Sequence, residues 1–234
     1  MELTKNTWNR QDIKQYSDYL KSLSGTEAQR CFEKRIANTS LDCLAIKANV
    51  IKDIVKQISK GNILEFLDFW QTHNLAEMYV FGKLINTQSD FDVIKKYLTK
   101  YANQCECWAT CDIIKPKITK NNKEQIYNMA VQYTKSEKTY VKRIGFRILF
   151  NYVDDKINEI LHIIDKFSDE KEYYVNMIIA WLLCECFIKQ RDKTLEYYQC
   201  NSLNQFTINK SIQKCIESFR VSNEDKQMLR TLKK

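Results

Sequence analysis

The sequence predicts an all-α protein, and composition and periodicity both support that fold class. The 234 residues include only four glycines and one proline, although 44% of the chain is hydrophobic. Sandwiches and doubly wound α/β folds need more glycine than this for their turns and phosphate-binding loops. Apolar residues also recur at the three- and four-residue spacings that are typical of an amphipathic helix. These observations argue against any fold built on a β-sheet.

The apolar spacing and the turn residues divide the chain into roughly a dozen helices. The first is predicted over 9–23, where Ile13, Tyr16 and Leu20 share one face and Gly25 follows as a stop. The lone Pro116 ends a helix because proline disfavours helical geometry in the residue before it. The remaining helices are predicted over 26–37, 41–58, 63–72, 75–86, 90–102, 104–115, 121–134, 138–152, 155–167, 170–189, 192–198, 205–219 and 222–232.

The helices recur in pairs about every 35–45 residues, a period compatible with HEAT-like repeats. The predicted architecture is a curved right-handed superhelical array of antiparallel HEAT-like helix pairs with a concave face. The sequence contains no strict repeat, so an irregular helical bundle is the alternative. No linker rich in proline, glycine or serine interrupts the chain, and we therefore predict a single domain over 1–234.

The chain is moderately basic, with a formal net charge of +8 and a pI near 8.9. A basic face would attract nucleic acid first and anionic membrane second. The alternative is a lysine-rich solvated surface, which is common in proteins of AT-rich bacterial genomes. The longest apolar run, 175–184, is too short to span a membrane and predicts a buried helix. Nine irregularly spaced cysteines indicate reduced thiols, so we expect a cytoplasmic protein.

The sequence offers little for metal or nucleotide chemistry. The densest thiol clusters lack the C-x2-C spacing of zinc sites, only two histidines are present, and buried free thiols are the expected outcome. The glycines are isolated, which argues against a phosphate-cradling loop, and no G-x-S-x-G elbow is present. We expect no metal and no cofactor. The residues concerned are Cys105, Cys107, Cys111, Cys184, Cys186, His73 and His162.

Trp108 and Asp112 are the most suggestive pair in the chain. On a helix their spacing of four places the indole and the carboxylate on one face, one turn apart. A flat apolar ring beside a fixed negative charge suits a planar or cationic ligand. An indole is more often a core residue, and a structural ion pair of Asp112 with Arg143 or Arg147 is an equal alternative for the acid.

At these residues the chain resembles the DNA alkylation repair family of HEAT-like-repeat glycosylases. Trp108 and Asp112 match the Trp-x3-Asp signature of that family, and residues 140–143 match its aromatic-hydrophobic-x-Arg stretch. The helix from Tyr174 to Trp181, with Glu185 four residues later, and the tail near 207–220 are also similar. The chain departs from the family where residues 45–52 lack the usual Gly-Val-x-x-Pro-x-x-Arg pattern. Three positions near the second Trp that are often basic are here Asn176, Met177 and Cys184.

The resemblance implies a glycosylase that acts on duplex DNA carrying cationic N3- or N7-alkylated purines. Asp112 would stabilise the oxocarbenium ion and position the attacking water. Trp108 and Trp181 would face the sugar of the lesion, and Arg143 would hold the neighbouring phosphate, with Lys142 and Arg147 as second choices. The three helices that carry these residues would line one groove, and the protein would act as a monomer. The alternative is a non-catalytic helical-repeat module of the same family that binds DNA or a protein partner.

Overall fold

The structure is a computed structural model that describes residues 1–233. These residues form 14 α-helices and one short 3-10 helix, and no strand is present among them. Within this described part of the chain, the only extended pairing is an isolated bridge between Asp42 and Asn74. The all-α prediction is therefore confirmed.

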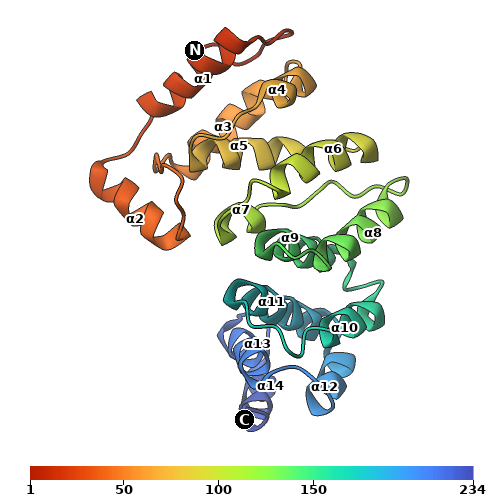
Figure 1. The fold of residues 1–234 in the computed structure, drawn as a ribbon. Coiled ribbons are helices and arrows are strands. Elements are labelled where there is room, and N and C mark those ends of the chain that lie inside the picture. The colour runs from red at the N-terminus through yellow and green to blue at the C-terminus, as the bar shows by residue number, and fades with distance from the viewer. Residues whose placement is uncertain (234) are drawn as a thin grey trace. The chain divides into compact units, whose positions relative to one another are not determined.

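The chain divides into two compact units, Met1–Lys123 and Glu124–Lys234. The first unit runs from red to yellow-green in Figure 1 and contains α1 to α7. Their bounds are α1 Arg10–Ser22, α2 Glu27–Ala37, α3 Ala48–Ile58, α4 Ile63–Phe69, α5 Leu75–Ile85, α6 Phe91–Ala102 and α7 Trp108–Asp112. The single domain over 1–234 and the right-handed superhelical curvature stay predictions.

The second unit runs from green to blue in Figure 1 and contains α8 to α14. Its first helix starts one residue before the division between the units. The bounds are α8 Lys123–Thr134, α9 Thr139–Leu149, η1 Phe150–Tyr152, α10 Ile157–Asp165, α11 Tyr173–Lys189, α12 Arg191–Gln199, α13 Gln205–Glu217 and α14 Asn223–Thr231.

The first unit is built around α5, which packs against α3 and α6. Phe81 on this helix stacks on Trp70 with ring centroids 3.7 Å apart, and Tyr101 lies parallel to Phe81 with its centroid 6.1 Å from Phe81 and 6.3 Å from Trp70. Gly82 makes room for that arrangement, because a Cβ there would lie 2.9 Å from the Tyr101 hydroxyl oxygen. The Tyr101 hydroxyl then donates to the backbone oxygen of Thr110 in α7 at 2.9 Å. The aromatic core thereby positions α7.

The predicted helix 41–58 is too long at its start, since α3 begins at Ala48. The preceding residues form a loop in which Ala45 adopts a left-handed φ of 50°. Its backbone N–H donates to the Glu33 carboxylate at 2.8 Å, and Gly25 N–H donates to the Leu44 carbonyl oxygen at 2.8 Å. Leu44 is buried in this loop. Its apolar character fits the buried face of a helix, but long-range hydrogen bonds hold this segment in a loop.

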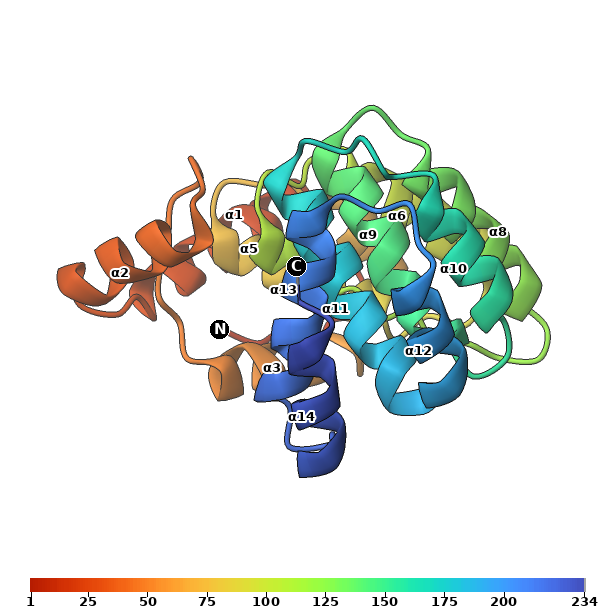
Figure 2. The ribbon, with the colours of Figure 1, turned by 90° about the horizontal axis from the view of Figure 1, so that it is seen from below.

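The second unit is organised around α11, which packs against α9, α12 and α13 (Figures 1 and 2). Ile178, Ile179, Leu182 and Leu183 of α11 are fully buried. Gly145 of α9 permits close contact with α8, because a Cβ there would lie 2.8 Å from the backbone oxygen of Ala130. Across residues 1–233, every helix falls short of the length and apolarity that crossing a bilayer requires.

Candidate functional site

The Trp108–Asp112 pair occupies the two ends of the short helix α7. The predicted helix over 104–115 is wrong in length, because only five residues are helical. Cys107 precedes it in extended geometry with φ −147°, and its carbonyl oxygen accepts a hydrogen bond from Thr110 Oγ1 at 2.9 Å. Thr110 and Cys111 are fully buried, whereas Trp108 and Asp112 are half-buried. The four-residue spacing therefore leaves the indole and the carboxylate partly accessible on one side of the helix.

Asn86 fixes the chain where it leaves α7. Its side-chain amide donates to the Ile113 carbonyl oxygen at 2.8 Å, and its oxygen accepts from the Lys115 backbone N–H at 2.8 Å. A five-residue helix has almost no intrinsic stability in water. Tertiary hydrogen bonds to the residues directly after α7 therefore hold Asp112 in place.

The Trp108 indole is held by α2. Its Nε1–H donates to the backbone carbonyl oxygen of Ile36, in the last turn of that helix, at 3.0 Å. This bond fixes the orientation of a ring that is only half-buried.

Glu106 adds a second link between α2 and the segment leading to α7. Its Oε1 accepts hydrogen bonds from the Thr39 hydroxyl at 2.6 Å, the Ser40 N–H at 2.8 Å and the Leu41 N–H at 2.9 Å. Partial burial acts to raise the pKa of Glu106, but these hydrogen bonds outweigh it and leave the pKa lowered from 4.5. The charged carboxylate is thus the form that binds residues 39–41.

Lys142 and Arg143 both make structural contacts within the second unit. The Lys142 Nζ pairs with the Glu170 carboxylate at 3.0 Å, and the two side chains are only 18% and 9% exposed. Arg143 is 5% exposed, and its Nη1 donates to the backbone carbonyl oxygen of Tyr174 at 2.6 Å. Both residues tie α9 to the segment that opens α11.

Arg147 and Trp181 form a different arrangement on the same two helices. The guanidinium carbon of Arg147 lies 5.6 Å from the Trp181 ring centroid and 5.2 Å from that of Phe150. Phe150 meets Trp181 edge-on, with centroids 4.8 Å apart. One turn after Trp181, Glu185 accepts two hydrogen bonds from the Arg220 guanidinium at 3.1 and 2.7 Å. The Trp181 ring therefore contacts the guanidinium of Arg147, and Arg220 is paired with the carboxylate one turn further along α11.

The structure thus brings the predicted residues together in two groups. Trp108 and Asp112 lie on α7 in the first unit, and Arg147 and Trp181 are in contact in the second. Sequence reasoning missed Glu106 and Phe150, whose roles depend on tertiary contacts. Arg220 was part of a recognised motif, but its pairing with Glu185 had no local signal.

Comparison with known proteins shows which family the chain belongs to. A family model described as DNA alkylation repair enzyme matches residues 5–215. The chain belongs to this family. The match includes Trp108, Asp112, Lys142, Arg143, Arg147 and Trp181, and it extends over parts of both units. No curated protein matches the chain significantly.

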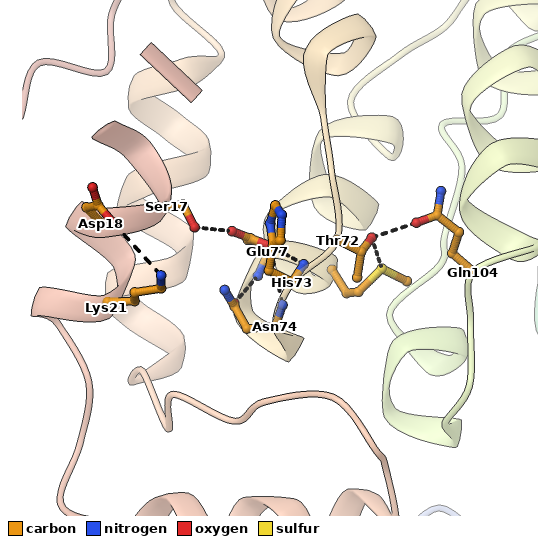
Figure 3. A network of polar contacts seen from close by, with 9 residues as sticks. Ser17, Asp18, Lys21, Thr72, His73, Asn74, Glu77 and Gln104 are labelled. Carbon is orange, nitrogen blue, oxygen red and sulfur yellow. Dashed lines mark hydrogen bonds and ion pairs between the residues drawn. The ribbon is translucent and has the colours of Figure 1, made fainter. Parts of the chain in front are cut away.

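This member of the DNA alkylation repair enzyme family has another buried carboxylate, Glu77, which is 2% exposed. Figure 3 shows it among partners from α1 and from the start of α5. It accepts hydrogen bonds from the Ser17 hydroxyl at 2.8 Å and the His73 backbone N–H at 2.6 Å, and it completes a capping box with Asn74. Glu77 therefore joins α1 to α5, and its oxygens are already occupied by structural bonds.

Proposed function

We propose that the chain is a DNA glycosylase that excises cationic N3- and N7-alkylated purines from duplex DNA. The observation that supports this most is the half-buried Asp112 beside the half-buried Trp108, on a helix with tertiary hydrogen bonds at Trp108 and directly after Asp112. Membership of the DNA alkylation repair enzyme family supplies the substrate class.

The proposed chemistry needs one carboxylate and little acid catalysis. An alkylated purine carries a positive charge, so it leaves readily once the glycosidic bond starts to break. The sugar then gains oxocarbenium character, which a carboxylate close to the anomeric carbon stabilises. Asp112 supplies that charge and positions the attacking water. Trp108 and Trp181 present ring faces whose negative quadrupoles favour the developing cation.

Arg147 is the better candidate for the DNA phosphate in this proposal. The family resemblance implies Arg143 in that role, with Lys142 and Arg147 as second choices. However, Arg143 is 5% exposed and bonded to the Tyr174 carbonyl oxygen, and Lys142 is paired with Glu170. Arg147 is half-buried beside the Trp181 ring, so a phosphate that reaches this ring also meets its guanidinium.

A base-release assay on duplex DNA methylated at purine nitrogens tests the proposal. Asp112→Asn keeps the shape of the side chain but removes its charge, so release of 7-methylguanine should fall by about two orders of magnitude or more. Duplex binding should stay within about two-fold, because one local charge contributes little to total phosphate attraction. Equal turnover by both proteins would reject the role of Asp112.

The second candidate function is a DNA-binding module without catalytic activity. The replacements Asn176, Met177 and Cys184, at positions that are often basic in the family, favour it. Such a protein would shift the methylated duplex without releasing base. In either case we propose that the protein acts in the cytoplasm as a monomer, without a metal or cofactor.

A further inference from the structure

Four aromatic rings form a continuous surface feature in the second unit, which we call the aromatic ledge. Tyr140 and Tyr174 have ring centroids 5.8 Å apart, Tyr174 and Tyr173 5.3 Å, and Tyr173 and Phe206 6.0 Å. These residues lie within the first two positions of α9, α11 and α13. Tyr173 is 53% exposed and Phe206 41% exposed, so packing in the hydrophobic core does not explain why these two positions are aromatic.

Buried polar contacts hold the three helix starts beneath the ledge. Arg143 of α9 bonds the carbonyl oxygen of Tyr174, while Asn176 of α11 accepts from the Thr207 hydroxyl of α13 at 2.8 Å. The Asn176 amide also donates to the Glu170 carbonyl oxygen at 3.1 Å. Arg143, Asn176 and Thr207 are each at most 5% exposed. The rings therefore stand on a rigid base, and a flat ligand would meet surfaces that are already positioned.

The charges near the ledge favour a polyanion with flat faces. The Lys210 ammonium lies 5.6 Å from the Phe206 ring centroid, and Lys138 and Lys171 are exposed two residues before Tyr140 and Tyr173. Glu172 is the exposed acid next to Tyr173. Aromatic rings interleaved with lysines are the combination that binds single-stranded nucleic acid, because bases stack on rings and ammonium groups neutralise phosphates.

Helical spacing relates the ledge to the Arg147–Trp181 contact. Tyr140 and Arg147 are seven residues apart on α9, as are Tyr174 and Trp181 on α11. Seven residues are nearly two turns, so each pair shares a helix face over about 10 Å. A DNA strand held at Arg147 and Trp181 can therefore extend along the same faces towards the ledge.

We propose that the aromatic ledge binds unpaired nucleobases of single-stranded DNA, with Lys210 and Lys171 contacting the phosphates. This inference rests on the proposed function only for the class of partner, which is DNA. It adds that the protein engages DNA in which a strand is locally unpaired, for example at a gap or an end.

Fluorescence anisotropy with a short labelled oligothymidine tests the ledge directly. The double variant Tyr173→Ala/Phe206→Ala should bind this probe roughly five-fold or more weakly than wild type, because each lost ring removes a stacking partner. Tyr173→Phe keeps the ring and should bind like wild type. Glu172→Gln removes the acid beside the ledge and should tighten binding.

Phe219→Ala is the matched control, since Phe219 is a fully exposed phenylalanine of the same unit outside the ledge. Circular dichroism establishes that all variants keep their helices. Equal affinities of wild type and the double variant for oligothymidine would overturn the proposal, and so would an equal loss in Phe219→Ala. Base release from methylated duplex separates the two ideas. If the protein releases no base but still needs Tyr173 and Phe206 to bind oligothymidine, the ledge proposal stands and the glycosylase proposal is rejected.

Discussion

The Trp108 indole is joined to the end of α2 by one hydrogen bond, from Nε1 to the carbonyl oxygen of Ile36 at 3.0 Å. The bond connects residues 72 positions apart and sets the plane of the ring that we place against the lesion. Glu106, two residues earlier, binds Thr39 and Ser40 and so holds the end of α2 to the same segment. Orientation of the candidate site thus depends on α2 as well as on α7.

Trp108→Phe should lower base release while retaining part of the activity. Phenylalanine keeps an aromatic face but cannot donate to Ile36, and a single hydrogen bond contributes about 1 kcal/mol. We expect kcat/KM for methylated duplex to fall roughly five-fold, whereas Trp108→Ala should cost considerably more. Single-turnover kinetics measure both. Identical rates for wild type and Trp108→Phe would show that the Ile36 bond does not position the ring.

Arg147→Ala should weaken binding to duplexes of any sequence by a similar factor. If Arg147 contacts one phosphate, its loss should reduce the slope of log affinity against log salt by about one. Anisotropy titrations between low and moderate salt give that slope.

Arg143→Ala is the comparison for Arg147, because Arg143 is buried and bonded to the Tyr174 carbonyl oxygen. Its removal should lower the melting temperature and leave the salt slope of the folded protein unchanged. The opposite result, a smaller slope with an unchanged melting temperature, would indicate that Arg143 and not Arg147 contacts the phosphate.

Glu106→Gln should remove a pH-dependent contribution to stability. The pKa of Glu106 is lowered in the folded protein, so its ionised form stabilises the fold at pH values above 4.5. That contribution is lost as the pH falls through the lowered pKa. The melting temperature of wild type should therefore exceed that of Glu106→Gln at neutral pH, and the difference should shrink in acid. A difference in melting temperature that stays constant with pH would contradict a stabilising role of the ionised Glu106 carboxylate.

Base release should continue in the presence of a chelator. Among residues 1–233 no group of three or more His, Cys, Asp or Glu side chains is arranged to hold a metal ion. We expect equal initial rates with and without EDTA. A loss of activity that zinc or magnesium restores would contradict the carboxylate mechanism proposed for Asp112.

Helix positions followed closely from local signals in the sequence. Asn9 with Asp12 forms a capping box at the start of α1, and Asp90 caps α6, close to where the predicted helices 9–23 and 90–102 begin. The largest errors lie at 41–47, 104–107 and 113–115, which the apolar spacing predicts as helix and which lie outside α3 and α7. Leu44 and Cys107 are buried like helix residues, but the Leu44 carbonyl oxygen accepts from the Gly25 N–H and the Cys107 carbonyl oxygen accepts from the Thr110 hydroxyl. Apolar spacing does not distinguish a buried loop from a helix face.

The sequence alone determined that this chain is all-helical. Glycine and proline are too scarce for the turns that β-sheet folds need, and the apolar residues recur at helical spacing. It also determined that Trp108 and Asp112 share one side of a helix, since that relation is local. Only the tertiary structure shows that Arg143 and Arg147 differ in burial and in partner. They are four residues apart on one helix, yet packing buries the first against the Tyr174 carbonyl and leaves the second beside the Trp181 ring. Burial and partner choice depend on contacts with other helices, which spacing along one helix does not encode.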